Sequence, residues 1–251
     1  MKSEVKDMIS ISAGSLGQLA VEGFCPRCFW IQINIKPFEM RMPGIFSSID
    51  SYIKYVVHTH FDKKGCLPDW FPENDKITKI VYPKPLHHSR YNIRISDVIL
   101  DGVPDDVFLM KDGGYFIVDY KTARFTKKQE GLIPQFEVQL NCYAYIAEKN
   151  PQIGLKPVEY LSLIFLEPQS SQKFIPKDDL IISMIKNDSF LLKFIPKEKK
   201  VKKDFELVEE LVKEAEKILK RNTPPNRLKD CKNCDKIDEL TKKLRDSENS
   251  Y

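Results

Sequence analysis

The stretch between residues 102 and 143 limits the folds open to this chain more than any other part of it. Residues 115–120 form an aromatic and β-branched run, and the Asp-Gly-Gly before them is a hairpin turn signal. We therefore predict a strand at residues 115–120. Residues 95–100 and 107–110 are expected to be its partner strands.

Three charged side chains are expected at one end of this strand. Alternate residues of a strand point to the same face, so Asp119 and Lys121 should lie side by side. Asp105 would arrive from the neighbouring strand. The sequence thus predicts a small acidic pocket with one ammonium group beside it.

Two carboxylates and a lysine suit phosphodiester hydrolysis with a divalent metal ion. Mg²⁺ and similar hard cations bind carboxylate oxygens and keep several waters. Such an ion lowers the pKa of its water and neutralises charge on the scissile phosphate. We predict Asp105 and Asp119 as metal ligands, with the carbonyl oxygen of Tyr120 as an additional one. Lys121 would orient the attacking water or stabilise the transition state.

Five residues in this stretch resemble the PD-(D/E)XK nuclease superfamily in order and spacing. Asp-x-Lys alone is a weak signal, because a surface ion pair on an edge strand gives the same tripeptide. Here it follows Gly-x-x-Asp and a hairpin, and it precedes Gln-x-x-x-Tyr on a helix. The matching residues are Asp105, Asp119, Lys121, Gln139 and Tyr143. The resemblance implies an α/β fold with a restriction-endonuclease-like core, in which helices flank a mixed central sheet.

The pattern is most similar to the RecB-like branch, which includes the CRISPR-associated exonucleases with a four-cysteine iron–sulfur cluster. This resemblance implies a deoxyribonuclease that uses Mg²⁺ or Mn²⁺ and acts as an exonuclease on single strands or duplex ends. In it, Gln139 and Tyr143 share one helix face and position the substrate or Lys121. The compatible pathways are DNA repair, recombination, CRISPR adaptation and phage DNA processing. The implied partners are DNA and the proteins of a DNA-processing complex.

A helix before the acidic motif is expected to supply a further metal ligand. Residues 47–61 carry apolar residues at helical spacing, and Gly65 follows them. Members of the family often take a ligand from such a helix, which makes Asp50, His58 and His60 the candidates. A lone helical histidine often only faces solvent, and Asp50 also suits a first helical turn. The sequence leaves this choice open.

Two Cys-x-x-Cys pairs account for four of the six cysteines, Cys25 with Cys28 and Cys231 with Cys234. Four thiolates suffice for a tetrahedral Zn²⁺ or a [4Fe–4S] cluster. Their separation predicts a metal centre that joins the two ends of the chain. The nuclease branch usually has one cysteine before its motifs and three after, so the arrangement here departs from it. We favour an iron–sulfur cluster, with zinc and four free thiols as the alternatives.

The resemblance spans residues 25–234, so we expect one nuclease domain at 1–235 and a charged tail at 236–251. No signal peptide or long apolar segment precedes the cysteines, which predicts a cytoplasmic protein with no membrane contact and no disulfide framework. The net charge is only +4, so DNA would need a local basic strip. The candidates, each of which can equally be a solvated surface, are Arg90, Arg94, Arg124, Lys127, Lys128 and residues 197–203.

The hydrophobic pattern predicts four further segments. Residues 10–29 should form a first helix region, and residues 205–220 have the clearest helical period in the chain. Residues 160–166 are continuously apolar, which is typical of a central strand. Residues 67–90 contain four prolines and are expected to be irregular.

Two functions of other classes also fit the sequence. One is a catalytically silent nucleic-acid-binding module on the same fold, although the intact Asp–Asp–Lys set argues against it. The other is a zinc-stabilised interaction protein in which Asp-x-Lys is accidental.

Overall fold

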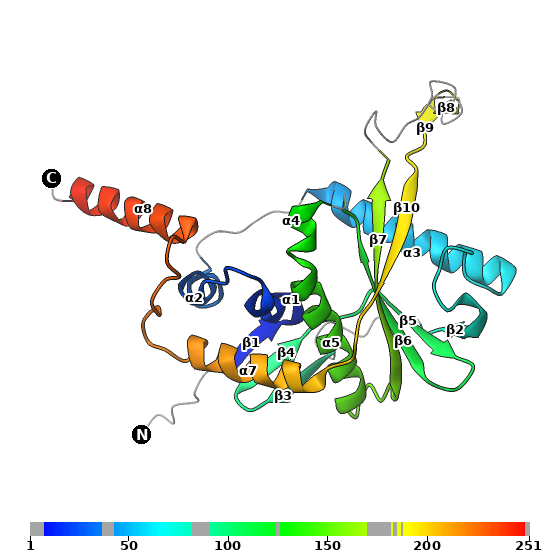
Figure 1. Cartoon of the computed structure of the whole chain (residues 1–251), viewed down its shortest axis with the longest axis horizontal. Coiled ribbons are helices and arrows are strands. Elements are labelled where there is room, and N and C mark those ends of the chain that lie inside the picture. Colours follow the sequence, from blue (N-terminus) through cyan, green and yellow to red (C-terminus); the bar gives the residue numbers. More distant parts are fainter. Residues whose placement is uncertain are drawn as a thin grey trace.

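A five-stranded mixed sheet lies at the centre of the computed structural model, which describes residues 8–36, 43–81, 91–123, 126–169, 182, 185–186 and 188–248 (Figure 1). Its order is β10–β7–β6–β5–β2. The strands are β2 (Ile77–Ile80), β5 (Asp106–Met110), β6 (Tyr115–Lys121), β7 (Val158–Pro168) and β10 (Phe194–Lys200). β6 and β7 run parallel, whereas the other neighbours are antiparallel. The strands predicted at 107–110, 115–120 and 160–166 are confirmed, and so is the α/β fold class.

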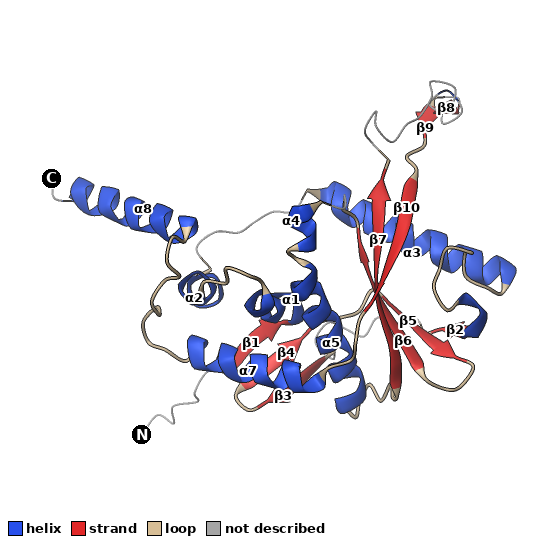
Figure 2. Ribbon diagram, in the orientation of Figure 1, coloured by secondary structure: helices blue, strands red, loops and turns tan. Residues whose placement is uncertain are grey.

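Helices cover both faces of this sheet (Figure 2). The parallel connection from β6 to β7 passes through α4 (Lys127–Glu130) and α5 (Ile133–Lys149), as a parallel pair requires. α5 packs on the face that carries Ile117 and Leu163, and α3 (Gly44–Lys64) packs on the face that carries Phe116 and Val118. Side chains alternate along β6, so Asp119 and Lys121 belong to the α5 side.

A second, three-stranded sheet corrects one expectation. Its order is β1–β4–β3, with β1 (Ile9–Ser12), β3 (Asn92–Ile95) and β4 (Val98–Asp101). Residues 95–100 were expected to pair with β6, but they contain the turn between β3 and β4. Ser96 has a φ of 56° there, which lets Ile95 pair with Val98. A polar two-residue turn thus ends what looked like one apolar strand.

The expected helix region at 10–29 is also divided. β1 is followed by α1 (Ala13–Gly17), a short 3-10 turn (Gln18–Ala20) and α2 (Pro26–Asn34). Ser12 caps α1, because its side chain accepts a hydrogen bond from the Ser15 backbone N–H. Gly23 has a φ of 79°, a backbone conformation that ends regular structure before Cys25 and Pro26 begin the next helix.

The other helix predictions are confirmed, and one irregular segment contains a strand. α3 ends at the left-handed Gly65, and α7 (Phe205–Leu219) is capped by Asp204. Residues 67–81 include a 3-10 turn (Asn74–Lys76) and strand β2, which pairs with β5 at the sheet edge. The segment at residues 67–90 was expected to be irregular, but residues 77–80 form a strand. Residues 82–90 lie outside the described part.

The remaining elements lie at the periphery. β8 (Ile185–Lys186) and β9 (Ser189–Phe190) form a short hairpin, and α8 (Lys232–Glu248) extends away from the sheets (Figure 1). Each helix in the described part of the chain is too short or too polar to cross a bilayer.

Candidate active site

Asp119 and Lys121 form a buried ion pair at the end of β6. The Asp119 side chain is 5% exposed, and the Lys121 Nζ lies 2.6 Å from its Oδ2. This oxygen has no aligned hydrogen-bond donor among the described residues, so only the lysine charge compensates it. Burial raises the pKa of Asp119 to about 6, Lys121 opposes the rise and Asp105 adds to it. A carboxylate held in this way is short of positive charge.

Lys121 contacts two side chains of α5, and a third supports one of them. Its Nζ donates to Gln139 Oε1 at 3.0 Å and lies 4.5 Å from the centre of the Phe136 ring. Gln139 in turn donates from Nε2 to the Tyr143 hydroxyl at 2.5 Å. The structure therefore brings together the Gln and Tyr of α5 and the Lys of β6, in a chain that fixes the position of the ammonium.

Gly102 makes room for this chain. A Cβ added there would lie 2.6 Å from Tyr143 Cε1 and 2.9 Å from Ala13 Cβ. The first residue of the Gly-x-x-Asp motif thus lets the Tyr143 ring approach the backbone that leads to Asp105.

Asp105 lies at the same end of the sheet and contacts both its neighbouring strand and α3. Its Oδ2 accepts the Tyr120 backbone N–H at 2.8 Å, and its Oδ1 lies 2.7 Å from Lys54 Nζ. Lys54 also donates to Asp50 at 3.0 Å. Burial opposes protonation of Lys54, but Asp105 and Asp50 outweigh it and raise the pKa of the lysine. Among the contacts of the described residues, Asp50 is linked to Asp105 through this lysine.

Lys54 was not singled out from the sequence. Its signal was available, because it lies four residues after Asp50 on the predicted helix and so shares its face. The sequence does not predict that this face of the helix lies close to Asp105.

A second buried carboxylate, Asp106, was also missed. It is fully buried, its Oδ1 lies 2.7 Å from His58 Nε2, and its Oδ2 accepts the Tyr120 hydroxyl at 2.7 Å. Burial, and then the Asp106 charge, raise the pKa of Tyr120 well above its usual range. His58 is thus tied to the residue after Asp105. His60 contacts the Cys66 carbonyl instead, through Nδ1 at 2.9 Å, and makes no described contact with the carboxylates.

These groups suit a hard divalent cation. The Asp105 and Asp119 carboxylates offer oxygen ligands, and Asp119 Oδ2, whose one charged partner is Lys121 among the described residues, is suited to a cation. The Tyr120 backbone is fixed between them by its hydrogen bond to Asp105. Lys54 and Lys121 supply the positive charge that the carboxylates otherwise lack.

The four cysteines of the two pairs meet in one cluster. Sγ–Sγ distances are 3.5 Å for Cys28 to Cys231, 3.5 Å for Cys28 to Cys234 and 3.7 Å for Cys25 to Cys234. All four sulfur atoms lie within 4.8 Å of one another. Among the described residues, this is the one group of three or more His, Cys, Asp or Glu side chains gathered so closely. The cluster joins α2 near the N-terminus to the start of α8, as expected.

The donor set fits a thiophilic metal ion. Burial raises the pKa of Cys25, but hydrogen bonds from the Cys28 and Leu228 backbone N–H groups outweigh it and bring the pKa to about 7. Burial raises the pKa of Cys234 to about 11 and that of Cys28 further. Without a cation, the Cys25 thiolate is therefore favoured, whereas burial opposes ionisation of Cys28 and Cys234. A bound metal removes that penalty.

The basic residues considered for a DNA path are largely paired. Lys197, Lys199, Lys200 and Lys203 contact Glu167, Glu137, Glu73 and Glu148. Arg94 contacts Asp97. Arg90, Arg124 and the Lys128 side chain lie outside the described part.

Comparison with known proteins finds a matching family and a structure of limited similarity. A family model, described as the PD-(D/E)XK nuclease superfamily, matches residues 64–237. No curated protein matches the chain. The crystal structure of SSO0001 is similar over 88% of this chain and 81% of that chain, at 13% sequence identity and a TM-score of 0.41.

Proposed function

This chain belongs to the PD-(D/E)XK nuclease superfamily, and from that premise we propose that it is a metal-dependent deoxyribonuclease. We place the chain in the RecB-like branch, as an exonuclease that acts on single strands or duplex ends. Residues 1–235 would form one nuclease domain, and residues 236–251 a charged tail. The observation that supports the proposal best is the buried Asp119, whose Oδ2 lacks a hydrogen bond beside the fixed ammonium of Lys121.

Asp105 and Asp119 would hold Mg²⁺ or Mn²⁺, with the Tyr120 carbonyl as a further ligand. When bound, the ion would activate water and neutralise charge on the scissile phosphate. Lys121 orients the attacking water and stabilises charge on the phosphate oxygens. Gln139 and Tyr143 hold Lys121 in place through the hydrogen bonds described above. Water would form the new P–O bond as the bond to the leaving sugar oxygen breaks; the attacking water gives up a proton to solvent, and the leaving oxygen takes one from solvent.

Lys54 and His58 organise the carboxylates from α3. Lys54 pairs with both Asp105 and Asp50, and His58 fixes the buried Asp106. Of the three upstream candidates, Asp50 and His58 are thus coupled to the site, through Lys54 and Asp106 respectively. His60 has the weakest case because its ring bonds the Cys66 carbonyl.

The cysteine cluster is proposed to hold a structural metal centre. A Zn²⁺ with sulfur ligands at about 2.3 Å places them about 3.8 Å apart in a tetrahedron, close to the 3.5–3.7 Å of three of the six sulfur pairs here. A [4Fe–4S] cluster, which the resemblance favours, needs the four sulfurs further apart. Iron, sulfide and zinc analysis of anaerobically purified protein, with its visible spectrum, distinguishes the two.

The test of the nuclease proposal is cleavage of end-labelled single- and double-stranded DNA with Mn²⁺. Lys121→Ala should lower the rate at least 100-fold, because it removes the group that stabilises the developing charge. The matched control is Lys213→Ala, an exposed lysine of α7. Equal cleavage by wild type and Lys121→Ala refutes the catalytic assignment. DNA binding without any cleavage supports the silent binding module instead.

A further inference from the structure

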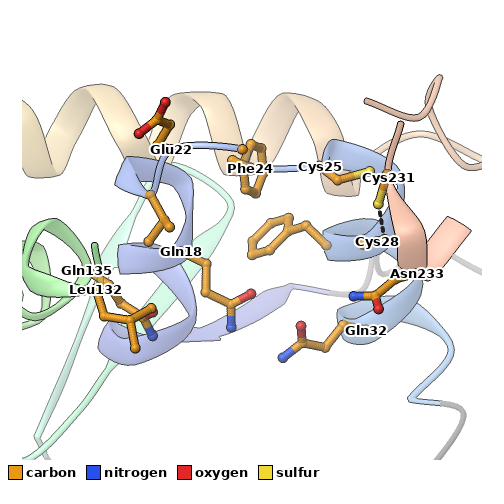
Figure 3. Close-up of a pocket in the computed structure, with 13 residues that line it drawn as sticks. Gln18, Glu22, Phe24, Cys25, Cys28, Gln32, Leu132, Gln135, Cys231 and Asn233 are labelled. Carbon is orange, nitrogen blue, oxygen red and sulfur yellow. Dashed lines mark hydrogen bonds between the residues drawn. The ribbon is translucent and has the colours of Figure 1, made fainter. Parts of the chain in front are cut away.

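A pocket of about 320 Å³ lies beside the cysteine cluster, outside the carboxylate site (Figure 3). Its walls come from the 3-10 turn after α1, from α2, from the start of α5 and from the start of α8. The packing of these elements is close. A Cβ on Gly17 would lie 2.3 Å from the Gln135 carbonyl oxygen. The pocket is therefore part of the folded core's edge rather than a gap between loose segments.

Side-chain amides are the main polar groups of this pocket. Gln18, Gln32, Gln135 and Asn233 all line it. Gln135 donates to the Gly14 carbonyl at 3.1 Å. The other three amides have no hydrogen-bond partner among the described residues, and Figure 3 shows them turned toward one open space. Each offers a donor and an acceptor side by side.

The charges of the pocket exclude a phosphate as its ligand. Its lining, as far as the structure describes it, contains no lysine or arginine. Its one carboxylate is Glu22, and the thiols of Cys25, Cys28 and Cys231 add negative charge when a metal is bound. Phe24 supplies aromatic surface, and its ring packs edge-on against the ring of the buried Phe29. The ligand that fits is planar and neutral, with donors and acceptors along its edge.

We propose that this pocket receives one base of a single-stranded DNA bound at the carboxylate site. Glutamine and asparagine amides pair with donor–acceptor edges of bases, and a glutamate accepts from an amino group. Bases stack on aromatic side chains of proteins that bind single strands. The inference rests on the proposed nuclease function and adds a subsite that reads a base rather than the backbone.

α5 connects the subsite to the proposed catalytic lysine. Gln135 lines the pocket, and Gln139, one turn later on the same face, accepts from Lys121. One turn advances about 5.4 Å, whereas a stacked DNA strand advances about 3.4 Å per nucleotide. The recognised base should therefore lie within about two nucleotides of the cleaved bond.

The experiment places a single abasic nucleotide at successive positions of a single-stranded oligonucleotide. With wild type and Mn²⁺, an abasic site at the recognised position should lower kcat/KM about tenfold, about 1.4 kcal/mol. In Gln18→Ala/Gln32→Ala that position should lose its effect, and the intact oligonucleotide should be cleaved about tenfold more slowly. Gln152→Ala, an exposed amide after α5, is the matched control and should keep the wild-type profile. Gln32→Ala alone, at an exposed position, serves if the double variant does not fold.

The outcomes separate this inference from the nuclease proposal. If wild type cleaves but no abasic position matters, or the variants keep the wild-type profile, the subsite is refuted. If wild type does not cleave at all, the nuclease proposal fails. The subsite is then tested by fluorescence anisotropy, which measures the affinity for intact and for fully abasic oligonucleotides without metal. The subsite predicts that wild type prefers intact DNA and that the variants lose this preference; any other result refutes it. Added deoxynucleoside monophosphates provide a further test. If the variants keep the wild-type abasic profile and lose only the inhibition of cleavage by these nucleotides, the pocket binds free nucleotides and the proposal is overturned.

Discussion

Replacing Asp119 with asparagine should stabilise the protein while abolishing cleavage. The carboxylate is buried beside Lys121, and its Oδ2 has no hydrogen bond in the described structure. Burial raises its pKa from 3.8 to about 6 despite the lysine. The fold thus disfavours the ionised form of Asp119. Asparagine has nearly the same shape as the neutral, protonated form and cannot ionise.

The magnitude follows from the difference between the folded and unfolded pKa values. One pKa unit corresponds to about 1.4 kcal/mol, so ionised Asp119 costs about 3 kcal/mol of folding stability above pH 6. Because the folded pKa is the higher one, this cost develops as the pH rises from about 4 to about 6. Asp119→Asn should therefore be about 3 kcal/mol more stable than wild type at pH 8, and about half as much at pH 5.

Urea unfolding in buffer without added divalent ions, with the cysteine centre loaded, measures this difference. Asp69→Asn, an exposed carboxylate, is the control and should change little at either pH. Added Mn²⁺ should stabilise wild type but not Asp119→Asn, because the substitution removes one of the two carboxylates proposed to hold the ion. An Asp119→Asn protein no more stable than wild type at pH 8, or a gap that does not narrow at pH 5, refutes the reasoning.

Three further substitutions test the surroundings of the site. Lys54→Met removes the ammonium that pairs with Asp105 and Asp50, so calorimetry should show Mn²⁺ binding about tenfold more tightly. Lys63→Met, on the same helix, is the control. Unchanged affinity in Lys54→Met, or an equal gain in Lys63→Met, contradicts this. Gly102→Ala should cost about 1–3 kcal/mol in urea unfolding, because its Cβ meets the Tyr143 ring. Gly44→Ala, which meets nothing within 4 Å, is its control, and equal stability of the two variants argues against the packing account. Cys231→Ala should lose the bound metal and lower the melting temperature, whereas Cys66→Ala, at an exposed thiol, should do neither; metal retained by Cys231→Ala rejects the four-cysteine centre.

The parts of the site that follow one another along the chain could be predicted from the sequence. β6 is long, apolar and bounded by a hairpin, so its pattern predicts both the strand and the shared face of Asp119 and Lys121. The i and i+4 spacing of Gln139 and Tyr143 likewise predicts a common helix face, and their hydrogen bond confirms it. In both cases the periodicity of one element decides the geometry.

The parts that depend on contacts between distant elements could not be predicted. Asp106 follows Asp105 directly, but its burial against His58 requires α3 to lie across the sheet. Lys54 reaches Asp105 for the same reason. The turn at Ser96 was missed for a different reason, because a short polar turn between two apolar runs resembles one strand with an alternating pattern.

The cysteine cluster also sets an order of events during protein synthesis. Cys28 and Cys231 are 203 residues apart, yet their sulfurs lie 3.5 Å from each other. At about 5–20 residues per second, the first pair leaves the ribosome roughly 10–40 s before the second. The proposed metal would be enclosed only after the nuclease core between the pairs has been translated. A chain that stops before Cys231 has only two of the four thiols, Cys25 and Cys28, and cannot complete the proposed centre, so its metal content would distinguish finished molecules from truncated ones.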